Sequence, residues 1–415
     1  MRGFIGVLGA LCFFSAAVFA DPTPTVQWTY RCGSEIYSSP VVVDITDEPG
    51  REILITSNTE RRVICLSAAG QVVWTYDQFS LRVTSTPTVA DIEGDGRLEI
   101  LVATRSDGIV WLSSLGERIR QVPVTGGIAW GNVSVANASP GQRPTLYWIS
   151  RKGFLDSRQA DGALNWSYRA DEPGPHGSPA VGDLNGDGVE EIVVGGGVGS
   201  LRCLDSSGDE RWRVRGMAPF QSGPVIADLN SDSKVEVMAA SDDGLLFCID
   251  GDSGAINWTH RTSTGRVDSS IAVGDIDGDG AREVFYGDGS GNFYALNCSG
   301  EELWYFDAGD WIESAPAIGD VDGDGGIDIL VGAGNGTLYC LSSAGELKWK
   351  FDAGRRISAS PTLSDCNEDG LVDILIPSHN GTLYCLSAGG AWDSTKILWP
   401  CKRYDLAQTA NVAVE

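Results

Sequence analysis

The stretch that decides the fold runs from Asp320 to Trp349 and reads DVDGDGGIDILVGAGNGTLYCLSSAGELKW. Its short runs of β-branched and aromatic residues are separated by Gly, Asn and Ser, which favour tight turns. Together with the preceding run Ala315-Pro-Ala-Ile-Gly319, the pattern predicts four short antiparallel strands. An acidic loop joins the first two strands, an Asn-Gly turn joins the second to the third, and the fourth strand carries the tryptophan.

The same unit recurs along the chain of 415 residues. Tryptophans follow one another at intervals of about 46 residues, with one double interval, at positions 28, 74, 166, 212, 258, 304 and 349. The start of the first strand is found near residues 39, 86, 132, 178, 223, 269, 315 and 360, and the third copy is blurred. A repeat of this length is typical of one propeller blade. The sequence therefore predicts an all-β fold, an eight-bladed β-propeller of four-stranded antiparallel blades.

Both ends of the chain could close the ring. The segment Val26-Gln-Trp28-Thr-Tyr30 has the pattern of a fourth strand without its blade, and we predict that it completes the eighth blade. The segment Ile397-Leu-Trp399 could serve in the same role. The sequence leaves this choice open.

The N-terminus has the features of a targeting segment. Arg2 precedes an apolar run from Phe4 to Phe19, and the small residues Val18 and Ala20 suit cleavage after Ala20. We therefore expect a signal peptide at 1–20, a propeller at 21–395, and a tail at 396–415 that packs on the ring or closes it. No later segment is long and apolar enough to span a bilayer, so the expected location is periplasmic, cell-surface or extracellular.

The charge and the cysteines exclude some functions. A formal net charge of −26 without a basic stripe argues against nucleic acid and against an anionic membrane surface. Removal of the signal peptide leaves nine cysteines, so at least one stays unpaired within the chain. One repeat position holds five of them, expected to be small buried side chains: Cys65, Cys203, Cys248, Cys340 and Cys385. Cys32, Cys366 and Cys401 could pair near the ring closure, and their pairing stays open.

The acidic loops carry the strongest chemical signal. They place oxygen-bearing side chains at positions 1, 3, 5 and 9 and glycine at position 6, an arrangement that lets a curled loop surround a calcium ion. Five loops have this pattern: Asp91/Glu93/Asp95/Glu99, Asp183/Asn185/Asp187/Glu191, Asp275/Asp277/Asp279/Glu283, Asp320/Asp322/Asp324/Asp328 and Asp365/Asn367/Asp369/Asp373. Such residues also favour ordinary turns, but five copies in one register favour about five to six Ca²⁺ sites.

Three further loops depart from the pattern. Asp228/Asn230/Asp232/Glu236 has Ser233 in place of the glycine, and we still include it among the predicted ligands. Asp44/Thr46/Glu48/Glu52 has Pro49 at that position and is doubtful. The third unit, at 137–145, has lost its acids and is expected to bind no metal.

These motifs resemble two families of propellers. The nine-residue acidic loop resembles the calcium loop of FG-GAP repeats, as in the integrin α-subunit propeller. The segment Leu338-Tyr-Cys-Leu-Ser-Ser-Ala-Gly-Glu-Leu-Lys-Trp349 resembles the tryptophan-docking repeat of PQQ-like propellers, which include quinoprotein dehydrogenases and a propeller lipoprotein of outer-membrane barrel assembly. The resemblance covers about 26–390, and the run Trp399-Pro-Cys-Lys-Arg-Tyr-Asp405 is similar to a tail of bacterial proteins of this hybrid kind.

The resemblance implies a fold and calcium more strongly than a function. A PQQ-dependent dehydrogenase of this kind uses two adjacent cysteines, which the chain lacks. A calcium-dependent polysaccharide lyase needs a base near the metal, for which His176 is the best candidate. We instead expect a non-catalytic binding or scaffold module for a protein or glycan ligand on one face. Off-pattern aromatic residues are the candidate contacts: Trp130, Trp148, Phe220, Trp311 and Trp392.

Overall fold

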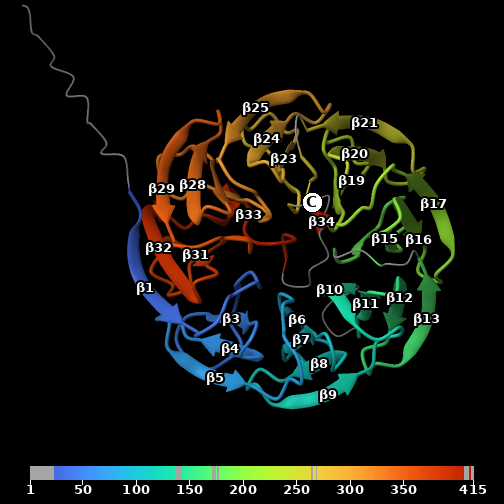
Figure 1. Ribbon diagram of the computed structural model, residues 1–415, viewed down its shortest axis with the longest axis horizontal. Helices are drawn as coiled ribbons and strands as arrows, with labels where there is room; N and C mark the ends of the chain where they lie inside the picture. Colours follow the sequence, from blue (N-terminus) through green and yellow to red (C-terminus); the bar gives the residue numbers. More distant parts are fainter. Residues whose placement is uncertain are drawn as a thin grey trace, which may run out of the picture.

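The computed structural model describes residues 23–136, 143–170, 174, 177–262, 265–267, 269–405 and 411–412. The predicted signal peptide at 1–20 and the candidate base His176 lie outside the described residues. The described chain forms eight small sheets arranged in a ring (Figure 1). Its one helical element, η1 (Ser394–Lys396), is a short 3-10 turn. Among the described residues, no helix has the length and apolar character needed to cross a membrane.

Each blade consists of an inner strand A followed outward by strands B, C and D. The strands of blades 1 to 4 are β2 (Val41–Val43), β3 (Glu52–Ser57), β4 (Arg62–Leu66) and β5 (Val72–Tyr76); β6 (Thr88–Ala90), β7 (Glu99–Ala103), β8 (Ile109–Leu112) and β9 (Arg118–Val122); β10 (Ala129–Ala136), β11 (Thr145–Ser150), β12 (Phe154–Arg158) and β13 (Leu164–Arg169); and β14 (Ala180–Gly182), β15 (Glu191–Gly195), β16 (Ser200–Leu204) and β17 (Glu210–Arg215).

The strands of blades 5 to 8 are β18 (Val225–Ala227), β19 (Glu236–Ser241), β20 (Leu245–Asp250) and β21 (Ile256–Arg261); β22 (Ala272–Gly274), β23 (Glu283–Gly287), β24 (Asn292–Leu296) and β25 (Glu302–Asp307); β26 (Ala317–Gly319), β27 (Asp328–Gly332), β28 (Thr337–Ser342) and β29 (Leu347–Asp352); and β30 (Thr362–Ser364), β31 (Leu371–Pro377) and β32 (Thr382–Ala391), with β1 (Thr25–Arg31) as the outer strand. The tail adds β33 (Ile397–Trp399) and β34 (Asn411–Val412).

The N-terminal strand closes the ring, as predicted. β1 pairs antiparallel with β32, with Thr29 opposite Tyr384, so blade 8 combines the two ends of the propeller (Figure 1). The tail instead turns inward. β33 pairs with the inner strand β26 of blade 7, and β34 runs parallel to β18 of blade 5. The segment Ile397–Trp399 therefore does not close the ring, because the outer position is already taken by β1.

A hydrogen bond from the repeated tryptophan joins five of the blades to the next one. Trp258 on β21 donates a hydrogen bond from its Nε1 to the carbonyl of Cys298 in the C–D turn of blade 6, at 2.9 Å. The indole also lies against Gly300, where a Cβ atom would come within 2.5 Å of the ring. Trp74, Trp166, Trp212 and Trp304 donate equivalent bonds to the next blade. The period of about 46 residues thus reflects a docking contact that recurs from blade to blade, although the Nε1 of Trp349 has no hydrogen-bond partner among the described residues.

The inner strands are linked by a chain of hydrogen bonds around the axis. The side chain at the start of one A strand accepts from the backbone N–H at the start of the neighbouring one, as Ser39 does from Ser360 at 3.0 Å. The sequence interrupts this chain at Gly223. A Cβ atom there would lie 2.2 Å from the Arg403 guanidinium, which donates to the carbonyl of Ser178 at 3.2 Å. The missing side chain leaves room for the tail.

The five cysteines at the shared repeat position are buried, as predicted. All nine cysteines among the described residues are free thiols, so Cys32, Cys366 and Cys401 form no disulfide with one another. Burial raises the pKa of Cys65 to about 12, which keeps such thiols protonated at neutral pH. These side chains act as small apolar packing groups.

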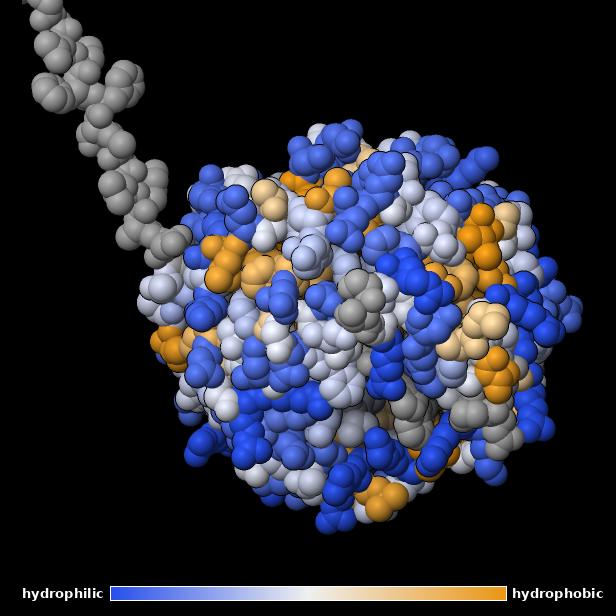
Figure 2. Space-filling model, turned by 45° about the horizontal axis from the view of Figure 1, so that its top comes forward, coloured by the Kyte–Doolittle hydropathy of each residue, from blue (hydrophilic) through white to orange (hydrophobic). Residues whose placement is uncertain are grey.

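The antiparallel topology separates the loops into two ends of the ring. The A–B loops and the C–D turns lie at one end of the strands, and the B–C turns and the D–A connections lie at the other. We call these ends the A–B face and the D–A face. The surface is mainly hydrophilic, and apolar residues form small separate groups in the view of Figure 2.

Candidate functional site

All seven described acidic loops share one anchoring contact. The carboxylate at position 9 lies at the start of strand B and accepts a hydrogen bond from the backbone N–H of position 2. In blade 4, for example, Leu184 donates to Glu191 at 2.9 Å. Equivalent bonds join Ile45 to Glu52, Ile92 to Glu99, Leu229 to Glu236, Ile276 to Glu283, Val321 to Asp328 and Cys366 to Asp373. The last predicted ligand therefore ties the loop to the sheet in each of these copies.

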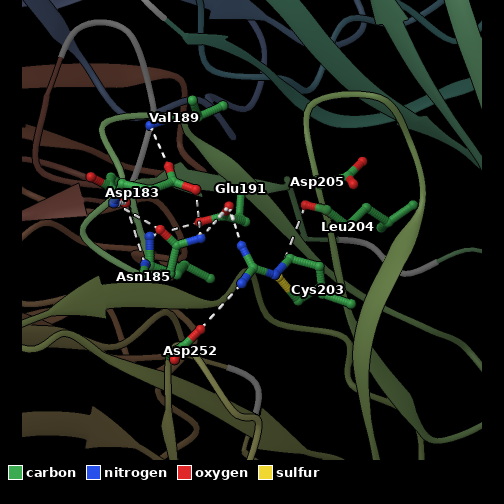
Figure 3. A network of polar contacts seen from close by, with 12 residues as sticks. Asp183, Asn185, Val189, Glu191, Cys203, Leu204, Asp205 and Asp252 are labelled. Carbon is green, nitrogen blue, oxygen red and sulfur yellow. Dashed lines mark hydrogen bonds and ion pairs between the residues drawn. The ribbon is translucent and has the colours of Figure 1, made fainter.

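The first aspartate curls the loop around itself. Asp183 accepts from the backbone N–H groups of Gly186 at 2.8 Å and Gly188 at 2.8 Å (Figure 3). In blade 5, Ser233 occupies the position of Gly188 with φ +68°, and its N–H still reaches Asp228 at 2.9 Å. The serine therefore keeps the backbone path, and it does so in the left-handed region that disfavours most side chains.

Two loops bring three carboxylates close enough to share one ion. One ligand oxygen from each residue lies within 4.8 Å of the others in Asp275, Asp277 and Glu283, and also in Asp320, Asp322 and Asp328. Calcium–oxygen distances are about 2.3–2.6 Å, so oxygens on one ion lie at most about 5 Å apart. The residues at positions 1, 3 and 9 of these loops fit a calcium ion. Asp279 and Asp324, at position 5, lie outside these two groups.

The loops of blades 2, 4, 5 and 8 keep the shared register, with Asp91, Asp183, Asp228 and Asp365 as their first residues. Among the described residues, none of them brings three acids within 4.8 Å of one another, and three of them carry an asparagine at position 3. Their predicted ligands at positions 3 and 5 are Glu93, Asp95, Asn185, Asp187, Asn230, Asp232, Asn367 and Asp369. The position 5 aspartates are exposed, and the role of all eight residues as ligands stays a prediction.

The asparagines at position 3 form hydrogen bonds inside their own loops. Asn185 donates from Nδ2 to Asp187 at 3.0 Å and to Glu191 at 3.1 Å (Figure 3). Asn230 donates to Asp232 at 3.3 Å, and Asn367 donates to Asp369 at 3.0 Å. The three amide oxygens accept from the backbone N–H of position 5. A calcium ion that binds in these loops would therefore have to break the hydrogen bonds from the asparagine amide groups to the carboxylates.

Three loops receive a cation from the protein itself. The Lys348 ammonium on β29 lies 2.6 Å from Asp322, 2.8 Å from Asp324 and 2.7 Å from Asp328. In blade 4, Arg211 on β17 lies 2.6 Å from Glu191. Sequence reasoning missed both cations because they lie on strand D, far from the loop in sequence. A signal was present, since each immediately precedes a docking tryptophan.

Blade 2 provides the third cation in a different way. Arg120 on β9 lies 3.0 Å from Glu93, so this predicted ligand is paired with a guanidinium while Asp95 extends into solvent. Arg120 follows Trp74 by 46 residues and therefore stands where the other blades carry the docking tryptophan. The double interval in the tryptophan repeat was the sequence signal for this exchange.

The neighbouring blades show the contrasting case. Leu303 of blade 6 occupies the repeat position of Lys348, so no lysine or arginine is offered to Asp275, Asp277 and Glu283 from that position. In blade 1, position 3 is Thr46 rather than an aspartate as in blades 6 and 7. Its hydroxyl donates a hydrogen bond to Glu52 at position 9. The acid-poor segment of the third unit lies largely outside the described residues. The seven described loops therefore differ in how their negative charge is balanced.

Burial makes these carboxylates costly to ionise. Together with the neighbouring carboxylates of Asp277, Asp275 and Asp279, it raises the pKa of Glu283 to about 7. Burial likewise raises the pKa of the position 9 acids Glu99, Glu191, Glu236 and Asp373 above the ordinary value. A bound cation favours the ionised forms, so charge as well as geometry supports metal binding here.

The predicted aromatic contacts divide into core and surface. Trp148 and Phe220 are fully buried, so the prediction that they contact a ligand is wrong, and both side chains fill the ring core. The side chain of Trp130 lies outside the described residues, and Trp392 is half-buried. Trp311 is also half-buried, with the Arg356 guanidinium 4.4 Å and the Arg266 guanidinium 5.5 Å from its ring centre.

Comparison with known proteins supports the fold. Residues 155–306 match the family model described as outer membrane protein assembly factor BamB, a PQQ-type repeat family. That part of the chain is similar to a PQQ-like propeller. Residues 316–360 match the model of the lambda-carrageenase β-propeller domain. No curated protein matches the chain in sequence.

Solved structures resemble the whole ring. BamB from Moraxella catarrhalis has a TM-score of 0.62 and 16% identity, covering 88% of this chain and 98% of its own. The biofilm matrix protein Bap1 of V. cholerae has a TM-score of 0.70 and 12% identity, covering 93% and 96%. Quinohemoprotein alcohol dehydrogenase from Comamonas testosteroni has a TM-score of 0.65 and 12% identity, covering 90% and 77%. At these identities the likeness concerns the fold alone.

Proposed function

We propose that the protein is an exported, calcium-binding β-propeller that acts as a non-catalytic binding or scaffold module for a protein or carbohydrate ligand. The observation that carries the calcium part is the loop of blade 6. There, Asp275, Asp277 and Glu283 converge without a lysine or arginine at the position of Lys348. We also propose that these loops are FG-GAP calcium loops, because their pattern of acids and glycine resembles that family.

The metal would join strands A and B of each blade that binds it. Position 1 follows strand A and position 9 lies at the start of strand B, so an ion held by both adds a link inside the blade. A ligand that binds only the folded chain stabilises it in proportion to the logarithm of its free concentration. With several loops of this kind, calcium would contribute to the stability of the whole ring rather than to a reaction.

The binding role is supported by the proteins that the chain resembles. The family model over 155–306 describes an assembly factor of outer membrane proteins, and one structural neighbour is a biofilm matrix protein. An assembly factor and a matrix protein are both roles of binding rather than of catalysis, and this supports the same class of role for the present chain. The match at 316–360 to a carrageenase propeller domain makes carbohydrate a ligand class to test.

Calcium binding is tested by thermal unfolding of the purified chain. We expect chelator to lower the melting temperature and added calcium to restore it, with magnesium at the same concentration restoring less. The Asp277→Asn variant removes one carboxylate from the blade 6 loop and should bind fewer calcium ions by titration calorimetry. A melting curve that is the same in chelator and in calcium would contradict the metal claim.

The binding role and export need separate tests. A glycan array and a pulldown from cell-surface extract should retain a ligand without product release, whereas turnover of a polysaccharide would favour the lyase alternative. For export, mass spectrometry of the protein recovered outside the cytoplasm should give Asp21 as the first residue. A chain retained in the cytoplasm with residues 1–20 attached would contradict export.

A further inference from the structure

A polar cavity lies on the axis of the ring, on the D–A face. Its volume is about 420 Å³, within the size range of small-molecule sites. Arg82, Arg266 and Glu313 reach it from D–A connections, and Asn58 and Arg105 reach it from B–C turns. The acidic loops belong to the opposite face, so this cavity is separate from the candidate metal sites.

The charge of the cavity is opposite to that of the protein. The chain carries a formal net charge of −26, yet four cationic side chains line this one cavity. They are Arg82, Arg105, Arg266 and Lys402. Among the described residues of its wall, the one carboxylate is Glu313, which forms an ion pair with Arg356. Bringing like charges together costs free energy, and a cleft lined by one sign of charge concentrates counter-ions. Such a cluster suits an anionic ligand.

The wall also includes an amide side chain. Asn58 is 3% exposed, and its Nδ2 donates towards the Glu35 carboxylate at 3.5 Å. This residue adds a neutral polar group to the wall beside the cations.

The rest of the wall favours a ligand rich in hydroxyl groups. Every described residue that lines the cavity carries a polar or charged side chain, including Tyr37, Gln221 and Ser358. Arg266 also extends over the ring of the half-buried Trp311, which holds its guanidinium beside the cavity. The combination of anion, hydroxyl groups and limited size matches an acidic sugar.

We propose that this axial cavity binds an acidic saccharide, with its carboxylate or sulfate held by Arg82, Arg105, Arg266 and Lys402. This site gives a place and a ligand class to the binding role proposed above, and it rests on that role. It does not depend on the acidic loops. Its failure would therefore leave the calcium proposal intact, because the melting curves in chelator and calcium test that proposal separately.

The lysine makes the affinity sensitive to pH. Removal from solvent inside the ring, with Arg403 next in the chain, lowers the pKa of Lys402 to about 8, while Glu313 opposes the shift. Arg82, Arg105 and Arg266 line the same cavity. An anion in the cavity favours the protonated lysine, so the lysine contributes to binding most below pH 8.

The test is titration calorimetry on the full, calcium-loaded chain. The probes are a galacturonate trimer, a sulfated galactose oligosaccharide, the neutral galactose trimer and inorganic sulfate. We expect at least one acidic oligosaccharide to bind at least tenfold more tightly than the neutral trimer and than sulfate alone. Equal binding of acidic and neutral trimers, no binding of either acidic probe, or sulfate binding as tightly as the acidic oligosaccharides would overturn the proposal.

Variants locate the site. Arg105→Met and Lys402→Met should each weaken acidic oligosaccharide binding at least tenfold. Arg118→Met, which removes an exposed arginine of the outer strand β9, is the matched control and should change it less than twofold. Lys402→Met removes a charge from the interior and should not impair folding, so it keeps the test valid if Arg105→Met unfolds. Unchanged binding in Lys402→Met would also contradict the proposal.

Discussion

The docking contact between blades can be tested at a single glycine. Gly300 lies in the C–D turn of blade 6 with φ +81°, and an added Cβ would lie 2.5 Å from Cδ2 of the Trp258 indole. Gly309 has almost the same backbone conformation, with φ +77°, but an added Cβ there would meet no atom within 4 Å. Gly300→Ala and Gly309→Ala therefore share the backbone strain and differ in the clash.

The expected magnitudes follow from that difference. A left-handed conformation costs alanine about 1–2 kcal/mol relative to glycine, and this cost applies to both variants. In Gly300→Ala the indole must also move, which loses its 2.9 Å hydrogen bond to Cys298 and part of its packing. A hydrogen bond contributes about 0.5–1.5 kcal/mol, and complete removal of a buried tryptophan costs about 3–5 kcal/mol. We expect losses of about 3–5 kcal/mol for Gly300→Ala and about 1–2 kcal/mol for Gly309→Ala.

The assay is urea unfolding in excess calcium, followed by tryptophan fluorescence and by circular dichroism. Agreement of the two signals justifies a free energy of unfolding for a ring of this size. In the Trp258→Ala background, Gly300→Ala should cost only the backbone strain, because the atom it strikes is gone. The reasoning is refuted if Gly300→Ala is as mild as Gly309→Ala, or if its cost is unchanged in the Trp258→Ala background.

Three further predictions concern charge. Lys348→Met should bind about one more calcium ion at low free calcium, as measured by equilibrium dialysis. The reason is that the ammonium group no longer competes with calcium for the carboxylates of the blade 7 loop. Lys350→Met, on the solvent side of the same strand, should leave the number of bound ions unchanged. Asp277→Asn should reduce the rise in melting temperature on adding calcium, whereas Asp77→Asn, an exposed aspartate in a D–A connection, should leave it as in the parent chain. Acidic oligosaccharide binding should weaken between pH 7 and 9 as Lys402 loses its proton around pH 8, and this dependence should disappear in Lys402→Met.

Much of the fold could be predicted because its signals are local or periodic. Turn residues and β-branched runs mark the strands, and the docking tryptophan marks each blade. The acidic loops were recognisable for the same reason, since the contacts from Asp183 to Gly186 and Gly188 span only a few residues. Their occupation by calcium stays a prediction.

The positions of the loop residues along the repeat do not determine which groups their side chains contact. A carboxylate or amide at position 3 satisfies the sequence pattern equally, yet Asn185 turns its amide hydrogens towards Asp187, and Glu93 turns towards Arg120. In blades 6 and 7 the aspartates at position 3 instead lie close to the acids at positions 1 and 9. The choice depends on hydrogen-bond partners and strand D cations that the pattern does not contain.

Other features could not be predicted from position in the repeat. Trp148 and Phe220 depart from the pattern of the other blades, and this suggested exposure. Both are instead buried, because an irregular unit must still fill the space between its neighbours. The balancing charges of Lys348 and Arg211 were missed because strand D meets the loop only after the blade has folded.

The sequence by itself determined the repeat, the eight blades and the register of the acidic loops, whereas the structure chose the N-terminal strand to close the ring. Each of these sequence features depends on neighbouring residues or on a fixed period. The tertiary structure alone decided that the tail turns inward at Gly223 and that cations from separate blades meet on the axis. Arg82, Arg105 and Arg266 are far apart in the chain, and only closure of the ring brings their charges to one cavity, on the face opposite the acids.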